Sequence, residues 1–193
     1  MDPVSRIKIT VSFWAVAAFG AVICIEQTAV IVLLCALVHE LGHLFACLIL
    51  NVQIEEFNLT ILGFGIVKSP VAPLKEILIT AAGPLAGLMF AGTAAVFNYR
   101  QIGVISLLLS TVNLIPVPPL DGDRILREVL PARIIFAVNT LSVTALFGFG
   151  LYLAVKFNGF TLLLFSLLLF CCMLGKYPQD ISAIMFRNLH RKF

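Results

Sequence analysis

Apolar stretches follow one another along almost the whole chain, separated by short segments that carry charges, glycine or proline. Most of these stretches approach 20 residues with few or no charges, the length that a helix needs to cross a hydrocarbon core of about 30 Å. The pattern predicts six transmembrane helices, at about residues 7–25, 28–50, 74–97, 103–115, 134–155 and 160–174.

Residues 51–68 interrupt this helical pattern. Apolar and polar residues alternate from Phe57 to Ile61, and Gly63 and Gly65 follow. Alternation with glycine at its end is typical of a hairpin with a turn or a bulge. Such a hairpin would either cap the helix bundle at its surface or offer an edge that pairs with an extended peptide. The expected fold is therefore a membrane all-α bundle of about six helices, with a small β-hairpin between the second and third.

The composition agrees with a membrane protein. Hydrophobic residues make up 61% of the 193 positions and charged residues only 12%, whereas soluble domains have about 25% charged residues. No linker, repeat or low-complexity run is visible, so we expect a single domain over residues 1–193. The five cysteines all lie in apolar stretches, where they are expected to pack as small hydrophobic residues and not as a disulfide framework.

Basic residues concentrate in the segments on one side of the predicted helices. With the N-terminus inside, eleven of the thirteen lysines and arginines fall in inner segments, and only Arg100 and Lys156 fall in outer ones. The positive-inside rule then places both termini in the cytoplasm. This anchoring explains the net charge of +3, so no nucleic-acid partner is expected. The compact size suggests a multi-pass protein of a prokaryotic cell membrane.

The stretch HELGH, residues 39–43, places two imidazoles and a carboxylate inside the second apolar stretch. His39 and His43 are four residues apart, so they lie one turn above each other on one helix face. Two imidazoles at this spacing can bind one zinc ion, while Glu40 acts as a general base. The alternatives are a packing role for these residues, or a site that binds zinc without catalysing a reaction. Placing a carboxylate at bilayer depth costs roughly 2.5–3.5 kcal/mol. This cost argues that Glu40 has a function.

The stretch NLIPVPPLDGDRIL, residues 113–126, is the candidate source of a third zinc ligand. Its three prolines cannot continue a helix without breaks, and irregular backbone at membrane depth is tolerated where it lines a polar cavity. Asp121 follows the prolines and is either a ligand or an ordinary helix cap. For Asp123, capping or pairing with Arg127 is the better interpretation.

With both motifs placed, the chain resembles the site-2 protease family of intramembrane zinc metalloproteases over about residues 30–130. The matching segments are residues 39–43, 113–116 and 120–122, with AAGPLAG at 81–87 between them. Within the last segment, the spacing of Gly83 and Gly87 predicts close packing of the third helix against the helices that carry the motifs.

The resemblance implies hydrolysis of a peptide bond within or near the membrane. It also implies that His39, His43 and Asp121 bind one Zn²⁺ per chain and that Glu40 is the general base. Asn113 and Pro116 occupy family positions near the substrate, although capping of the broken helix is an equal alternative for Asn113. The six predicted spans resemble the compact branch that contains the sporulation protease acting on a sigma-factor precursor, without its CBS domain and without the PDZ insertion of larger members.

The partners expected from this function are the lipid bilayer and a membrane-protein or membrane-associated peptide substrate. Association with a second copy or with a regulatory membrane protein stays open. The alternative functions are a zinc-binding scaffold or regulator, which would not need Glu40, and a metal-ion transporter. A transporter should carry polar groups in both halves of the membrane, and here the outer half has almost none.

Overall fold

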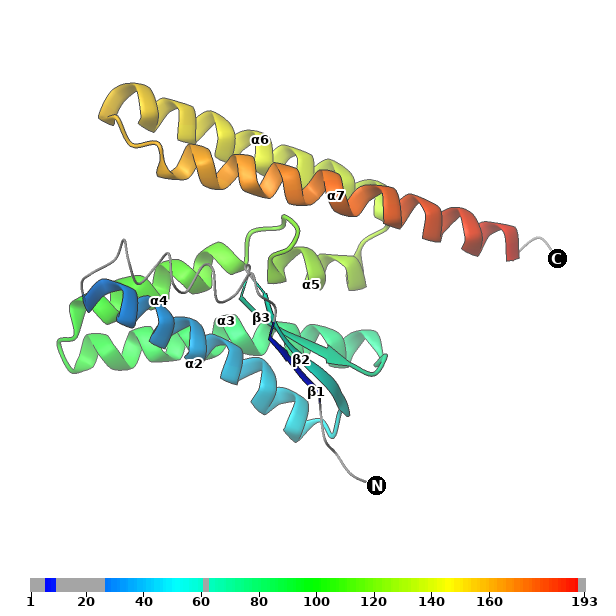
Figure 1. Ribbon diagram of the computed structural model, residues 1–193, viewed down its shortest axis with the longest axis horizontal. Helices are drawn as coiled ribbons and strands as arrows, with labels where there is room; N and C mark the ends of the chain where they lie inside the picture. Colours follow the sequence, from blue (N-terminus) through cyan, green and yellow to red (C-terminus); the bar gives the residue numbers. More distant parts are fainter. Residues whose placement is uncertain (1–5, 10–26, 61–62, 191–193) are drawn as a thin grey trace. The chain divides into compact units, whose positions relative to one another are not determined.

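The computed structural model describes residues 6–9, 27–60 and 63–190. These residues form six helices and three strands, and the chain divides into two compact units, residues 1–113 and 114–193. Each unit is described separately (Figure 1).

Among its described residues, the first unit has three helices that lie side by side, α2 (Gln27–Ile49), α3 (Pro73–Val96) and α4 (Arg100–Asn113). The buried face of α2 consists of four residues at intervals of four, or about one turn: Cys35, His39, His43 and Cys47. The opposite face exposes large apolar side chains, among them Leu33, Leu37 and Phe45. A helix that is apolar around most of its surface, with a narrow polar stripe facing its neighbours, is typical of a membrane interior.

A three-stranded sheet also belongs to the first unit. Strands β2 (Ile54–Thr60) and β3 (Gly63–Lys68) pair antiparallel, with an irregularity between Ile54 and Glu56. They lie in the segment where alternating residues predicted a hairpin. A third strand, β1 (Arg6–Ile9), pairs parallel with β2 and completes the order β1-β2-β3.

Strand β1 corrects the predicted start of the first transmembrane helix. Residues 7–9 were expected to begin that helix, but they pair with residues 57–59 of β2. Isoleucine is favoured in strands, and the sequence near Ile7 contains no trace of a partner some fifty residues away. Residues 10–25, the remainder of the predicted helix, lie outside the described residues.

The second unit contains α5 (Asp121–Val129), α6 (Ala132–Phe157) and α7 (Thr161–His190). Helices α6 and α7 form a hairpin (Figure 1), which turns at Asn158 in the left-handed conformation with φ of 53°. The backbone of Leu163 passes so close to Gly150 that an added Cβ atom would lie 2.9 Å from it. An apolar core holds the unit together and consists of Val117, Val143, Leu169 and Met173.

The proline-rich segment between α4 and α5 is not helical, as its sequence predicted. Residues 114–120 form turns, in which the amide of Val117 donates to the carbonyl of Ile115 and that of Leu120 to the carbonyl of Val117. Helix α5 then begins at Asp121. This break places Asp121 at the start of a helix, next to irregular backbone.

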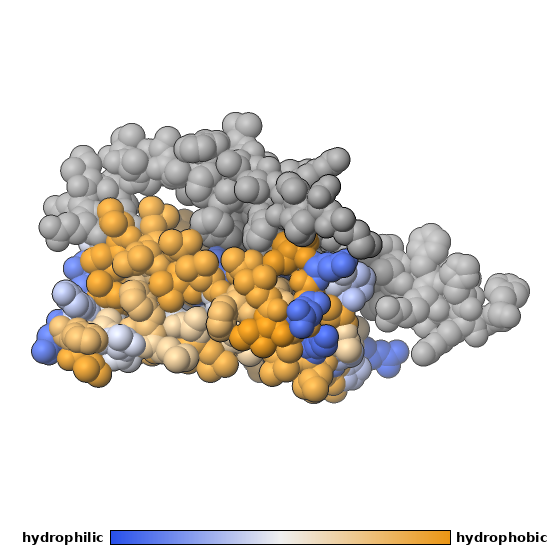
Figure 2. Space-filling view, turned by 90° about the horizontal axis from the view of Figure 1, so that it is seen from below, coloured by the Kyte–Doolittle hydropathy of each residue, from blue (hydrophilic) through white to orange (hydrophobic). Residues whose placement is uncertain are grey.

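Three helices in the described part of the chain are long and apolar enough to cross a membrane, over residues 30–49, 73–96 and 132–157. The apolar part of α7, residues 161–175, is shorter, and α4 has 14 residues. The face drawn in Figure 2 agrees with this, because its coloured residues are mostly hydrophobic and the hydrophilic ones gather towards its ends. The chain is thus an integral membrane protein of mainly helical fold.

Candidate metal centre

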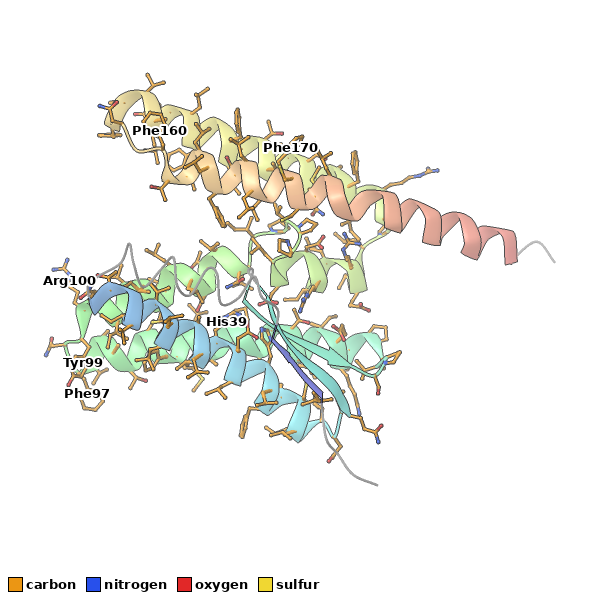
Figure 3. All side chains as sticks on the ribbon, viewed as in Figure 1. His39, Phe97, Tyr99, Arg100, Phe160 and Phe170 are labelled. Atoms are coloured by element: carbon orange, nitrogen blue, oxygen red, sulfur yellow. The ribbon has the colours of Figure 1, made fainter. Side chains whose placement is uncertain are left out.

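His39 and His43 point from the buried face of α2 towards one another. Their Nε2 atoms lie 3.3 Å apart, and the two rings are nearly perpendicular, at 81°. Only 3% of His39 and 8% of His43 is exposed; His39 is labelled in Figure 3. The helical spacing of four residues therefore brings the two ring nitrogens close together, on the one helix face where the sequence predicted both side chains.

A backbone carbonyl of α3 sets the tautomer of His43. Its Nδ1 lies 2.8 Å from the carbonyl oxygen of Ile79. A carbonyl oxygen can only accept, so Nδ1 carries the proton and donates it, and the lone pair of the neutral ring resides on Nε2. A second hydrogen bond of this kind is what usually orients a metal-binding histidine. Sequence reasoning did not identify Ile79, because any residue type supplies the same carbonyl.

The distance between the two Nε2 atoms is that expected for two ligands of one zinc ion. Zn–N bonds of about 2.0–2.1 Å with tetrahedral angles place two nitrogen ligands about 3.3–3.4 Å apart. The observed separation is 3.3 Å, and the lone pair of His43 is on the correct atom. The pair therefore fits a zinc ion without rearrangement of α2.

Glycines allow α3 to pack directly against this pair. A Cβ atom added to Gly83 would overlap the imidazole of His43, and one added to Gly42 would lie 2.7 Å from the Cβ of Ala86. The predicted close packing of the third helix against the motif-bearing helix is confirmed. The contact is closer to the site than expected, since Gly83 adjoins Nε2 of His43 itself. The small-residue segment 81–87 was the signal in the sequence.

Glu40 follows His39 on α2 and is half-buried. Successive helical residues are about 100° apart, so its carboxylate starts from the edge of the buried face. The two cysteines of that face have other roles: the thiol of Cys35 lies 3.8 Å from the carbonyl of Ile102, and Cys47 packs with Val52 and Ile79. Both are free thiols within the interior of the first unit.

In the second unit, Asp121 is the first residue of α5 and is buried. One of its oxygens lies 4.0 Å from the guanidinium of Arg124. Gly122 follows, and it packs so tightly that an added Cβ would overlap the carbonyl of Leu114. The start of α5 is thus held against the irregular segment that precedes it.

Asp123 pairs with Arg127, as predicted, through a bond of 2.8 Å from Nε to Oδ2. Its side chain is fully buried, and its other oxygen accepts a hydrogen bond of 2.9 Å from the amide of Asn139 on α6. A helical projection places Asp123 away from Asp121 but contains no information on α6, which covers that side.

The two residues assigned to substrate by resemblance occupy the region where α4 ends. Asn113 is the last residue of α4, and its side-chain amide donates to the carbonyl of Leu109 at 3.0 Å. Pro116 is half-buried in the non-helical segment that follows. The bond of Asn113 lies within its own helix and agrees with the alternative of local capping.

Comparison with known proteins gives a consistent result. The sequence pattern of Peptidase family M50 matches residues 95–155. Stage IV sporulation protein FB of Bacillus subtilis (strain 168) is 28% identical over 197 residues, covering 95% of this chain and 62% of that protein. Zinc metalloprotease MJ0392 of Methanocaldococcus jannaschii is 30% identical over 107 residues, covering 49% of this chain and 32% of that protein. The chain thus spans less than two thirds of the length of either relative.

The fold is similar to that of a solved site-2 protease. The structure of the site-2 protease from Methanocaldococcus jannaschii superimposes with a TM-score of 0.61 over 88% of this chain and 89% of that one, at 20% sequence identity. The architecture is therefore that of a site-2 protease. Together with the M50 pattern and the sporulation relative, this fold makes the chain similar to site-2 proteases in both sequence and architecture.

Proposed function

We propose that the chain is an intramembrane zinc metalloendopeptidase that cleaves a membrane-associated protein within or near its transmembrane segment. The observation that carries this proposal is the pair of Nε2 atoms 3.3 Å apart on a helix apolar enough to cross a membrane. Soluble enzymes use the same pair for peptide hydrolysis. Here the surrounding helix exposes large apolar side chains, which supports a site that acts on substrates within or near the bilayer.

His39, His43 and Asp121 are the proposed ligands of one Zn²⁺. Three protein ligands with one open position are the usual set of a catalytic zinc site, and His₂ plus a carboxylate is among its common forms. All three side chains are buried, so each needs a partner that offsets the loss of hydration. The proposal requires residues 1–113 and 114–193 to act together as one proteolytic domain.

Glu40 is the proposed general base. A zinc ion bound at this site would supply Lewis acidity, polarising the peptide carbonyl and lowering the pKa of water. Glu40 removes a proton from the attacking water, whose oxygen bonds to the carbonyl carbon. As the C–N bond breaks, Glu40 returns that proton to the leaving nitrogen. The nearness of Glu40 to His39 in the helix brings its carboxylate beside the ligands without making it one.

We further propose six membrane spans with both termini in the cytoplasm of a prokaryotic cell. The distribution of basic residues supports this orientation, which puts the histidine pair in the cytoplasmic half of the membrane. The sheet containing β2 and β3 follows α2 on that side, where its edge can pair with an extended substrate segment. Asn113 and Pro116 are proposed to contact that segment.

The test is co-expression with epitope-tagged single-span membrane precursors, comparing the wild type with Glu40→Gln. We expect cleavage by the wild type and a loss on the order of 10²–10⁴ in rate for Glu40→Gln, with zinc retained. Glu128→Gln is the matched control, because Glu128 lies exposed on α5 and should leave cleavage unchanged. Zinc binding without cleavage of any precursor by the wild type would indicate a scaffold instead.

A further inference from the structure

A groove of 550 Å³ lies between α3 and α4, away from the histidine pair. Its walls are apolar over most of their area and include Leu88, Gly92, Ala95, Val104 and Leu107. Asn98 and Arg100 provide polar groups at one end, where α3 turns into α4. This volume is within the range of about 300–1,000 Å³ that is typical of small-molecule sites.

Two glycines shape the groove. An added Cβ atom at Gly103 would lie 3.3 Å from the carbonyl of Ala91, so the two helices approach closely there. On α3, Gly92 follows Ala91, and an added Cβ atom at Gly92 would meet nothing within 4 Å. The absence of a side chain at Gly92 is therefore not required by packing, and it leaves the space of the groove open.

The turn at the polar end has the composition of a membrane interface. Phe97 and Tyr99 expose 67% and 63% of their surface, and Figure 3 shows both beside Arg100 at this turn. Aromatic residues and arginine are enriched at the level of the lipid headgroups. Arg100 makes no ion pair with any described residue, so its charge is available to a phosphate.

The length of the groove favours a lipid chain over a helix. From Leu88 to Ala95 the lining of α3 extends about 10 Å, at about 1.5 Å per residue. This is most of one leaflet of a hydrocarbon core about 30 Å thick, whereas a helix that crosses the whole core is about 20 residues long. Val104 and Leu107, on the other wall, are about half exposed, at 48% and 49%.

We propose that this groove binds one molecule of an anionic glycerophospholipid, with an acyl chain against Gly92 and the phosphate at Arg100. Charge complementarity and the depth of one leaflet support this occupant. The inference rests on the membrane location of the chain but not on the proposed peptidase activity. Its test therefore measures lipid and not cleavage.

Native mass spectrometry of the full chain in detergent provides that test, with palmitoyl-oleoyl phosphatidylglycerol as the probe. We expect one lipid to remain bound per wild-type chain. Gly92→Leu should lower its affinity about ten-fold, because the new side chain displaces roughly two methylenes of the acyl chain. Gly148→Leu on α6 is the matched control, since an added Cβ atom there also meets nothing within 4 Å.

Arg100→Gln and a diacylglycerol with the same chains test the phosphate contact. Loss of one cationic contact near the membrane surface should weaken phosphatidylglycerol binding about five-fold and leave diacylglycerol binding unchanged. Equal retention of the lipid by the wild type and Gly92→Leu would overturn the proposal. So would a shift from dimer to monomer in Gly92→Leu without a change in bound lipid, because the groove would then bind a second copy.

Discussion

The side-chain amide of Asn139 donates a hydrogen bond of 2.9 Å to Oδ1 of Asp123, and neither residue has any exposed surface. The other oxygen of Asp123 accepts from Arg127 at 2.8 Å. A buried carboxylate thus joins the short helix α5 to the long helix α6, two residues after the proposed zinc ligand Asp121. This arrangement holds the start of α5 from one side, while the irregular segment at Leu114 packs on Gly122.

The first prediction concerns this link. Asn139→Ala removes the amide and leaves one oxygen of a buried carboxylate without that donor, which costs about 1–3 kcal/mol. The melting midpoint of the purified protein in detergent should fall accordingly. Thr140→Ala, at the adjacent exposed position, should change the midpoint much less. Equal midpoints for Asn139→Ala and the wild type would show that the bond does not stabilise the second unit.

The second prediction separates the two aspartates of α5 by isosteric change. Asp121→Asn should lose zinc, because an amide is a poor replacement for a carboxylate ligand. Asp123→Asn should keep zinc, since its partners are Arg127 and Asn139. Elemental analysis of zinc per protein on both purified variants makes the comparison. If Asp123→Asn loses the metal while Asp121→Asn retains it, the assignment of the carboxylate is wrong.

The third prediction concerns the glycine behind His43. Gly83→Ala places a methyl group where the imidazole lies, so His43 must move away from its bond to Ile79. Loss of such an orienting contact typically lowers metal affinity 10–100-fold. Zinc affinity can be measured by competition with a chelator. Gly148→Ala, in open space on α6, is the control, and unchanged affinity in Gly83→Ala would contradict the proposed packing.

The fourth prediction concerns topology. A reporter fused after Phe193 should be active in the cytoplasm, and one inserted in the turn at Asn98 should be active on the opposite side. The distribution of basic residues is the physical reason. Reversed activities would place the histidine pair in the outer half of the membrane and Arg100 at the cytoplasmic headgroups.

Local patterns in the sequence determined the parts of this protein that depend on one helix. The four-residue spacing of His39 and His43 is sufficient to bring two imidazoles together once the segment is helical. The length of the apolar stretch around them predicts that helix. The prolines at 116, 118 and 119 likewise determined that α4 must end before Asp121. In each case the relevant groups are neighbours along the chain, and helix geometry alone relates them.

Tertiary structure decided whatever depends on a partner distant in sequence. Strand β1 forms because β2 supplies hydrogen bonds from about fifty residues away, and no hydropathy pattern near Ile7 reveals that edge. The tautomer of His43 is decided by a carbonyl of α3, and the burial of Asp123 by an amide of α6. Every residue type has the same backbone carbonyl, so the sequence does not mark the one that bonds to His43. A single asparagine in an apolar helix likewise does not indicate which residue its side chain contacts. Only the packing of one helix against another determines which groups they reach.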